Sequence, residues 1–150
     1  MEYDLEKDFF VAVKWKDIKV GRIIKVLKNE VIPADLLIVK SSSENGFCYL
    51  QTTNLDGESA LKPRETMAIF QKLIKTEKDF KNNLMGCIDF DPPNENIYKV
   101  EGSIYLKDQE AAFFDINNIA LRGATLKNVD FIYGLVIYTG KDTKIMKNIK

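Results

Sequence analysis

The chain has 150 residues, 45% hydrophobic and 29% charged, a composition typical of one globular domain with its own core. Its 22 basic and 22 acidic side chains cancel, so no overall positive field attracts nucleic acid or an anionic membrane. It contains no histidine, which excludes Ser-His-Asp and Cys-His catalysis within the chain and removes a common metal ligand.

The N-terminal third predicts short strands. Residues 1–9 begin acidic and polar and are expected to form a flexible segment that frays, followed by a domain over residues 10–150. Apolar residues predict strands over 10–15 and 19–27, and a buried strand over 36–39. The second of these strands is expected to share one apolar face, made of Ile18, Val20, Ile24 and Val26.

A hairpin is predicted next. Residues 41–46 end in Asn45-Gly46, a dipeptide that supplies the positive φ angles of a tight turn. The run Phe47 to Thr53 is then expected to pair back on the strand at 36–39.

The rest of the chain predicts one helical insert among further strands. Apolar residues recur at helical spacing just after Arg64, at Met67, Phe70, Leu73 and Ile74. A kink or bulge is expected at Gly102, and a loop over 107–115. Strands are predicted over 87–90, 98–105, 119–121, 125–126 and 131–138, and the start of a helix over 141–150.

Short strands with turn signals about every ten residues predict a mainly β fold. We expect a β-sandwich or distorted jelly roll, like a double-stranded β-helix, with the short helical insert packed on it. A parallel α/β fold would need helices between successive strands. No apolar run approaches the roughly 18 residues of a membrane span, so a cytosolic location is expected. Cys48 and Cys87 are far apart and predict buried thiols rather than a zinc site.

The candidate functional residues are Asp56, Gly57, Glu58 and Ser59, directly after a predicted strand. Strand ends fix the base of a loop, and Gly57 allows a tight turn or a close approach to a partner. Glu58 at the tip can orient a water or accept its proton. Taken alone, Asp-Gly is also one of the commonest turn dipeptides, so a plain turn is the alternative.

Several stretches match one family in order and spacing, from about Phe10 to Asn148. These stretches are 15–21, 29–37, 55–59, Pro93-Asn94 with Tyr98, Gly102, 121–123, 126–128 and 138–144. Together they resemble the actuator domain of type IV P-type ATPases, the phospholipid flippases. Asp-Gly-Glu in the loop favours the lipid-transporting branch over the cation pumps.

The resemblance implies a role for each loop residue. Glu58 would position and activate a water that hydrolyses the aspartyl phosphate on a separate phosphorylation domain. Gly57 would let the loop approach the phosphate, while Asp56 and Ser59 would hold the shape of the loop.

The resemblance also implies the setting. The chain would be a cytosolic domain of an integral membrane protein, an ATP-driven phospholipid translocase. Its partners would be the phosphorylation and nucleotide-binding domains, phospholipid bound through the transmembrane domain, and as a further candidate an accessory subunit, but no nucleic acid. ATP and Mg²⁺ would serve the parent protein. No cofactor or metal is expected in this domain, which is not expected to turn over by itself.

Four positions depart from the family pattern. Ser59 replaces threonine and keeps the hydroxyl, whereas Ala60 replaces asparagine and loses a side-chain hydrogen bond. Arg22 replaces aspartate and Val129 replaces threonine, both at positions expected to be structural. The alternative function is therefore a non-catalytic regulatory or binding β-domain, such as a degenerate flippase-like module fused to another enzyme.

Residues outside the loop also have expected roles, some of them with an alternative. Arg122 is expected either to dock on phosphate or on acidic side chains of a partner domain, or to form a surface salt bridge of little energetic weight. Trp15 is expected in the core. The last four lysines are expected on a solvated helix face, with contact to anionic lipid headgroups as the alternative: Lys141, Lys144, Lys147 and Lys150.

Overall fold

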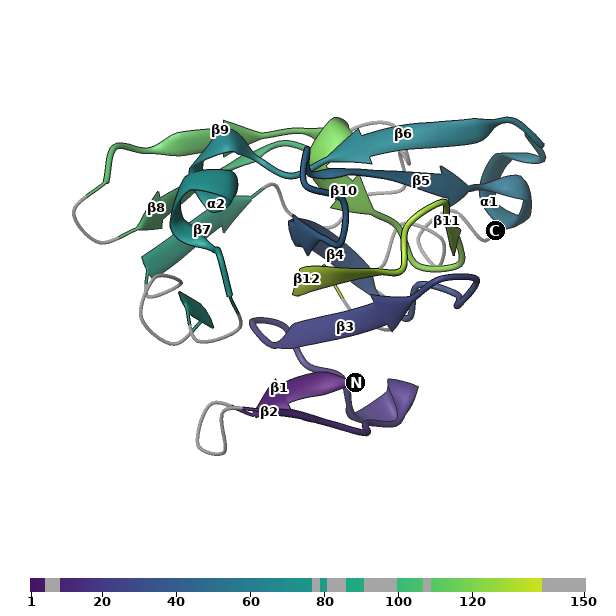
Figure 1. Ribbon diagram of the computed structural model, residues 1–150, viewed down its shortest axis with the longest axis horizontal. Coiled ribbons are helices and arrows are strands. Elements are labelled where there is room, and N and C mark those ends of the chain that lie inside the picture. Colours follow the sequence, from purple (N-terminus) through teal and green to yellow (C-terminus); the bar gives the residue numbers. More distant parts are fainter. Residues whose placement is uncertain (5–8, 77–78, 81–85, 91–99, 107–108, 139–150) are drawn as a thin grey trace.

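The computed structural model describes residues 1–4, 9–76, 79–80, 86–90, 100–106 and 109–138. Figure 1 shows a mainly β molecule with short helices, which confirms the predicted fold class. The strands are β1 Glu2–Asp4, β2 Phe9–Val11, β3 Ile23–Leu27, β4 Asp35–Ser41, β5 Phe47–Gln51, β6 Leu61–Glu65, β7 Gly86–Phe90, β8 Gly102–Leu106, β9 Ala112–Phe114, β10 Ile119–Ala120, β11 Thr125–Lys127 and β12 Phe131–Tyr138. The helices are α1 Thr53–Asp56 and α2 Ala68–Leu73, with 3₁₀ turns η1 Trp15–Asp17 and η2 Ile116–Asn118.

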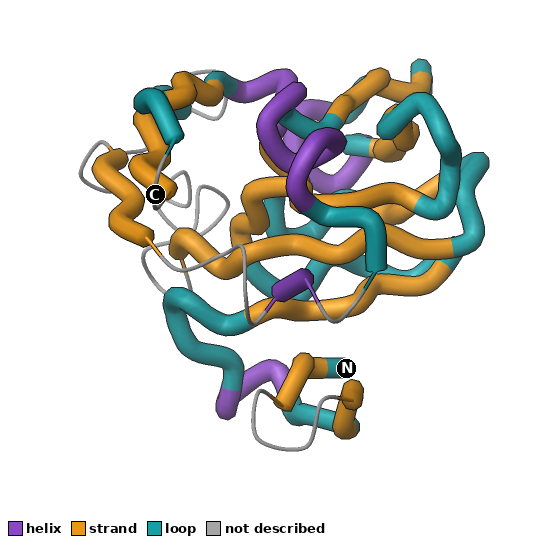
Figure 2. The backbone as a smooth tube through the Cα atoms, turned by 60° about the vertical axis from the view of Figure 1, so that its left-hand side comes forward, coloured by secondary structure: helices purple, strands orange, loops and turns teal. Residues whose placement is uncertain are grey.

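These strands form three antiparallel sheets. The central sheet has the order β10-β4-β12-β3-β1-β2, and the two smaller sheets have the orders β11-β5-β6 and β7-β8-β9. β12 lies between β3 and β4, and all but its first residue are buried. Figure 2 shows β1, β2 and η1 at one margin of the molecule, away from α2. The central sheet is therefore the layer on which the rest of the chain is assembled.

Both faces of the central sheet are buried. Leu37 and Val39 of β4 belong to one apolar cluster, and the alternate residues Leu36 and Ile38 belong to the other. This alternation follows from the two-residue period of a strand, which sends successive side chains to opposite faces. A continuous apolar run such as 36–39 is what a strand covered on both faces requires.

Different elements pack on the two faces of the central sheet. Phe70 of α2 and Ile104 of β8 belong to the first cluster, so the predicted helical insert packs on this side. Leu50 of β5 and Leu126 of β11 belong to the second, so the β11-β5-β6 sheet covers the other side. Full burial of a side chain such as Phe70 contributes about 1.5–3 kcal/mol. The sheet that carries the candidate loop is thus held from beneath by packed apolar side chains.

The predicted hairpin between 36–39 and Phe47–Thr53 is wrong. β4 pairs with β12 and β10, whereas β5 pairs with β6 and β11, so residues 42–46 connect two sheets. Gly46 has φ 79°, and Ser41 Oγ donates a hydrogen bond to Phe47 O at 2.8 Å. The connection is a tight turn as expected, but it redirects the chain instead of returning it to β4.

Other element boundaries also differ from the sequence prediction. Glu2–Asp4, predicted to fray, pairs with β2 and contacts β3 through Glu2. Val20 is 53% exposed because it lies in a turn before β3 and not on the shared apolar face. β9 lies within the predicted loop, and β8 begins at Gly102 in regular register with Phe114, where a kink was expected. The predicted helix at 141–150 lies outside the described residues, as do the side chains of Trp15 and Cys87.

Candidate functional site

The four candidate residues lie in the connection between β5 and β6. These strands are antiparallel, and Gln51 pairs with Leu61 at the end of the ladder. The connection, 52–60, starts with the single helical turn α1, which the sequence analysis did not predict. Figure 1 places α1 at the end of the molecule opposite α2, beyond the end of β5. The candidate loop is therefore the projecting tip of a β-hairpin with a packed base.

The side chain of Asp56 holds the loop together through hydrogen bonds to other residues of the loop. Its Oδ1 accepts a hydrogen bond from Thr52 Oγ1 at 3.0 Å and another from the backbone N–H of Glu58 at 3.0 Å. Thr53 Oγ1 donates to the backbone oxygen of Glu58 at 3.1 Å. Both backbone polar groups of Glu58 are thus held by side chains at the start of the loop. Thr52 is 5% exposed, so this arrangement is anchored in the protein interior.

Gly57 ends α1 in the left-handed conformation. Its φ is 73°, and its N–H donates to Thr53 O at 2.9 Å, which caps the helical turn. A Cβ added to Gly57 would meet no heavy atom within 4 Å. The glycine is therefore required by backbone conformation, and the space beside it is open to a partner.

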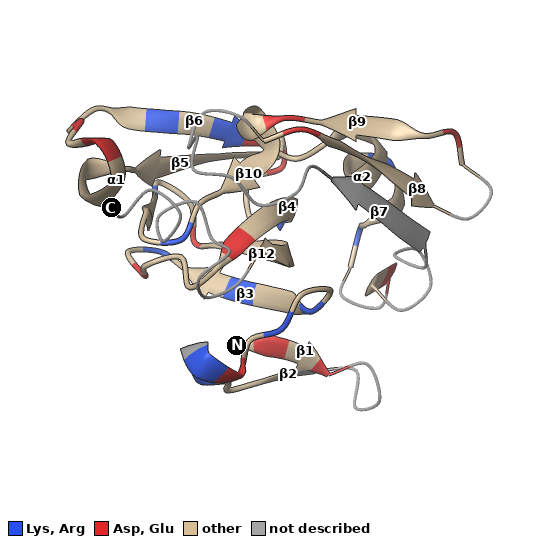
Figure 3. Cartoon of the chain, turned by 180° about the vertical axis from the view of Figure 1, so that it is seen from behind, with Lys and Arg blue, Asp and Glu red and all other residues tan. Residues whose placement is uncertain are grey.

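Glu58 and Ser59 form the exposed tip. The Glu58 side chain is 50% exposed, and its Oε2 forms an ion pair with Nζ of Lys62, whose side chain is 26% exposed. Figure 3 shows acidic residues at the loop beside α1 and basic residues on β6. Ser59 is exposed, and its side chain makes no hydrogen bond to any residue that the structure describes. Of the two residues predicted to hold the loop's shape, only Asp56 makes the contacts to do so.

A second stretch of the family resemblance, residues 121–123, lies against this loop. Asn54 Nδ2 donates to Gly123 O at 3.5 Å, which brings residues 121–123 beside α1. Arg122 donates its backbone N–H at 2.9 Å to Oδ1 of Asp35, a carboxylate that is fully buried at the start of β4. The sequence feature that could have indicated this contact is the position of Asp35, directly before the apolar run 36–39. Asn54, Asp35 and Lys62 are the site-building residues that the sequence reasoning missed.

Cys48 does not supply a nucleophile. It is fully buried beneath the β5–β6 sheet, and burial raises the pKa of its thiol to about 12, although the nearby Arg64 guanidinium lowers it in part. The thiol is therefore protonated near neutral pH, and thiols react through the thiolate. Its position in the second apolar cluster agrees with the predicted packing role.

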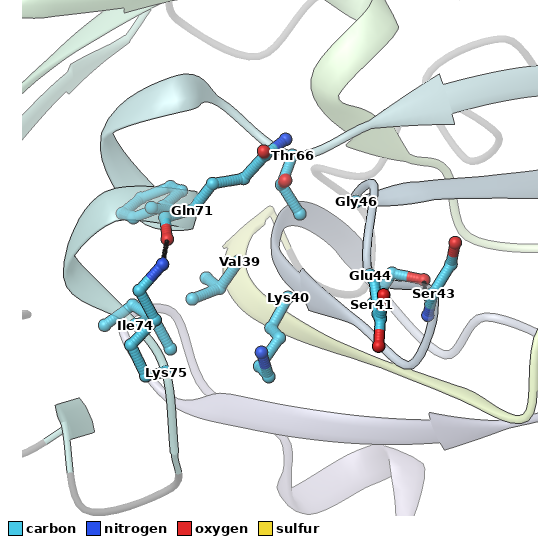
Figure 4. Close-up of a pocket in the computed structure, with 11 residues that line it drawn as sticks. Val39, Lys40, Ser41, Ser43, Glu44, Gly46, Thr66, Gln71, Ile74 and Lys75 are labelled. Atoms are coloured by element: carbon cyan, nitrogen blue, oxygen red, sulfur yellow. Dashed lines mark hydrogen bonds between the residues drawn. The ribbon is translucent and has the colours of Figure 1, made fainter.

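A pocket of about 250 Å³ lies away from the loop, between α2 and the β4–β5 connection. In Figure 4, Lys75 donates to the backbone oxygen of Gln71, at 2.6 Å, along its wall. Gly46 lines this pocket and precedes β5, whereas the candidate loop follows β5, so roughly 15 Å of strand separates them. The pocket belongs to the helical insert and not to the candidate site.

Among the described residues, no group of three or more His, Cys, Asp or Glu side chains could hold a metal ion. No helix in the described parts of the chain is long and apolar enough to span a bilayer.

Comparison with known proteins gives the family. No family model matches the chain. The chain is 41% identical over 139 residues to the mouse protein phospholipid-transporting ATPase IC, with 93% of the chain covered. It is 43% identical over 141 residues to phospholipid-transporting ATPase DRS2 of Saccharomyces cerevisiae, with 94% covered, and 38% identical over 134 residues to probable phospholipid-transporting ATPase 11 of Arabidopsis thaliana, with 89% covered.

The chain belongs to the phospholipid-transporting ATPase family. It spans only 10–11% of the length of these relatives, so it matches one segment of a phospholipid-transporting ATPase. The alignment covers about nine-tenths of the chain, which is consistent with a single domain of that family. The resemblance drawn from separate motifs is therefore confirmed at the level of the family.

Proposed function

We propose that the chain is the actuator domain of a phospholipid flippase. Its Asp56-to-Ser59 loop would promote hydrolysis of the aspartyl phosphate on the separate phosphorylation domain and couple that step to lipid translocation. The observation that carries the proposal is an exposed glutamate on a backbone held by side chains: Glu58 projects from the tip, while Thr53 and Asp56 bind its backbone groups.

The reaction requires an oriented water and a nearby acceptor. Glu58 would accept a proton from water while the water oxygen attacks phosphorus in line with the aspartyl oxygen. The phosphorus–oxygen bond to the aspartate then breaks, which yields inorganic phosphate and a free aspartate carboxylate. General-base assistance of this kind contributes about 10²–10⁴-fold to a rate. Fixing the backbone of Glu58 in advance lowers the entropic cost of placing the water.

The two carboxylates of the loop would have different roles. Oδ1 of Asp56 is occupied by Thr52 and the Glu58 N–H, so this side chain is committed to the loop's interior. Direct contact between Asp56 and a phosphate would also be repulsive. Glu58 lies outward and would face the phosphate through water, and the open space beside Gly57 would admit a phosphorylated surface.

The parent protein would supply everything else. ATP and Mg²⁺ would act at the phosphorylation and nucleotide-binding domains, and phospholipid would bind the transmembrane domain, with an accessory subunit as a further partner. The chain would then be a cytosolic domain of a membrane translocase, inactive by itself. None of the four loop residues would hold a metal or a cofactor.

The test is the lifetime of the phosphoenzyme in the full-length parent carrying Glu58→Gln. The glutamine keeps the size of the side chain and removes the proton acceptor, so the phosphoenzyme should accumulate and decay slowly. Decay at the unaltered rate would favour the alternative, a non-catalytic regulatory or binding β-domain. The feature that favours this alternative is Ala60, at a position where the resemblance implies asparagine.

A further inference from the structure

If the loop acts on a phosphate, the negative charges of its carboxylates would be repelled by that phosphate. Asp56 and Glu58 carry two negative charges within three residues, and both would be brought toward an anionic group. Like charges at short range repel, most strongly where water is excluded. Lys62 is a cation in direct contact with one of these carboxylates, that of Glu58.

Lys62 belongs to the rigid part of the hairpin. It is the second residue of β6 and pairs with Leu50, which is buried in the second apolar cluster. Along β6, Lys62 and Arg64 are partly buried, while the alternate residues are exposed. Lys62 therefore reaches the loop from the inner side of the strand, with its backbone fixed by the sheet.

The contact is not the usual neighbour pair of a helix. Glu58 and Lys62 are four residues apart, but Lys62 lies in a strand and Glu58 lies in the loop that precedes it. They meet because Gly57 and the hydrogen bonds of Asp56 turn the backbone of Glu58 back toward β6. The ion pair is thus a product of the loop's particular shape.

The contact also uses only one oxygen of the carboxylate. Oε2 of Glu58 pairs with Nζ of Lys62, while Oε1 accepts no hydrogen bond from any described residue. A carboxylate held at one oxygen keeps the other available as an acceptor in a restricted orientation. That is the arrangement needed to orient a water.

We propose that Lys62 is a positioning residue for phosphate hydrolysis: its ammonium holds Oε2 of Glu58, leaves Oε1 to orient the attacking water, and offsets one negative charge of the loop. The inference rests on the proposed function of Glu58. The proton released by the water goes to the Glu58 carboxylate, and Lys62 keeps its own protons throughout.

The experiment measures phosphoenzyme decay in the full-length parent carrying Lys62→Met, Lys62→Arg or the matched control Lys72→Met, an exposed lysine of α2. Lys62→Met should slow decay about fivefold, the upper range for a partly exposed ion pair. Lys62→Arg should restore most of the rate, and Lys72→Met should leave it unaltered. If the Lys62→Met protein does not fold, Lys62→Gln replaces it, and the same slowing of phosphoenzyme decay is expected.

Two readouts separate positioning from a merely structural role. In the Glu58→Gln background, Lys62→Met should cause no further slowing, because the group it positions is gone. The second readout is the comparison of Lys62→Arg with Lys62→Met: only a role that depends on the positive charge predicts that arginine restores the rate while methionine does not.

The outcomes distinguish the two proposals. If Glu58→Gln decays at the unaltered rate, the proposed function fails, and Lys62 has nothing to position. If Glu58→Gln is slow but Lys62→Met decays normally, the Lys62 inference alone is overturned. Equal slowing by Lys62→Met with and without Glu58, or failure of arginine to restore the rate, would likewise overturn it.

Discussion

Asp56 Oδ1 accepts the backbone N–H of Glu58 at 3.0 Å, so one carboxylate of the loop shapes the backbone that carries the other. The same oxygen accepts a hydrogen bond from the hydroxyl of Thr52, a buried residue directly after β5. The path from the sheet to the exposed glutamate is therefore a short series of hydrogen bonds, each of which can be removed by substitution.

Removing the hydroxyl of Thr52 should loosen the loop without altering its charge. Thr52→Val removes the hydroxyl that donates to Asp56 Oδ1, and the expected loss of folding free energy is about 1 kcal/mol. Thr52→Ser is the matched control because it keeps the hydroxyl. Urea unfolding of the chain measures both, and an equal loss in the two variants would show that packing, not the hydrogen bond, matters here.

Glycine substitutions should separate backbone strain from steric clash. Gly57→Ala forces a left-handed conformation on alanine but meets no neighbour, so it should cost about 1–2 kcal/mol. Gly46→Ala has a similar φ, and its Cβ would also lie 2.5 Å from Thr66 Oγ1 and 2.6 Å from Gln71 Nε2. The free energy of unfolding should therefore fall further for Gly46→Ala, and the reverse order would contradict this account of the two turns.

The buried carboxylate of Asp35 should be needed for stability. Asp35→Ala leaves the N–H of Arg122 without its partner and should cost about 2–3 kcal/mol. Asp35→Asn keeps an acceptor oxygen and should cost less. Chemical denaturation measures the difference, and a loss of under about 0.5 kcal/mol in Asp35→Ala would mean that the contact is replaced by solvent.

The Cys48 thiol should be unreactive in the folded chain, because burial raises its pKa to about 12 and blocks access. Its folded pKa lies above the ordinary value of 9.0, so the unfolded chain loses this proton first as the pH rises. The contribution to stability is therefore fully present below about pH 9 and declines between about pH 9 and 12.

Iodoacetamide labelling followed by mass spectrometry of the peptide that contains Cys48 measures this reactivity. The same chain in denaturant is the control and should label fully. Rapid labelling of the folded chain at pH 8 would contradict the burial of this side chain.

The pattern of apolar residues predicted the strands and helices whose own residues show a local periodicity or apolar run. The run at 36–39 became β4, and Met67 and Phe70 marked the helical insert that packs on the sheet. The partners of these elements were not predictable in the same way. β4 pairs with β12, about a hundred residues further on, and no local turn signal specifies such a long-range pairing.

The sequence singles out the four residues of the candidate loop, but it does not predict how the loop is built. The sequence around Pro63 lacks apolar alternation and shows no strand signal, yet β6 forms there at the edge of its sheet, where a missing N–H is tolerated. That strand brings Lys62 to Glu58. A contact between a strand and a loop depends on the three-dimensional path of the turn at Gly57, which composition and periodicity do not reveal.

The most direct test of the central claim is the rate of phosphoenzyme decay in the full-length parent carrying Glu58→Gln, after phosphorylation by radiolabelled ATP and a chase with unlabelled ATP. The matched control is Glu101→Gln, an exposed glutamate outside the loop. The account predicts that Glu58→Gln slows decay by about 10²-fold or more while the control decays normally. Decay of the Glu58→Gln phosphoenzyme at the control rate would contradict it.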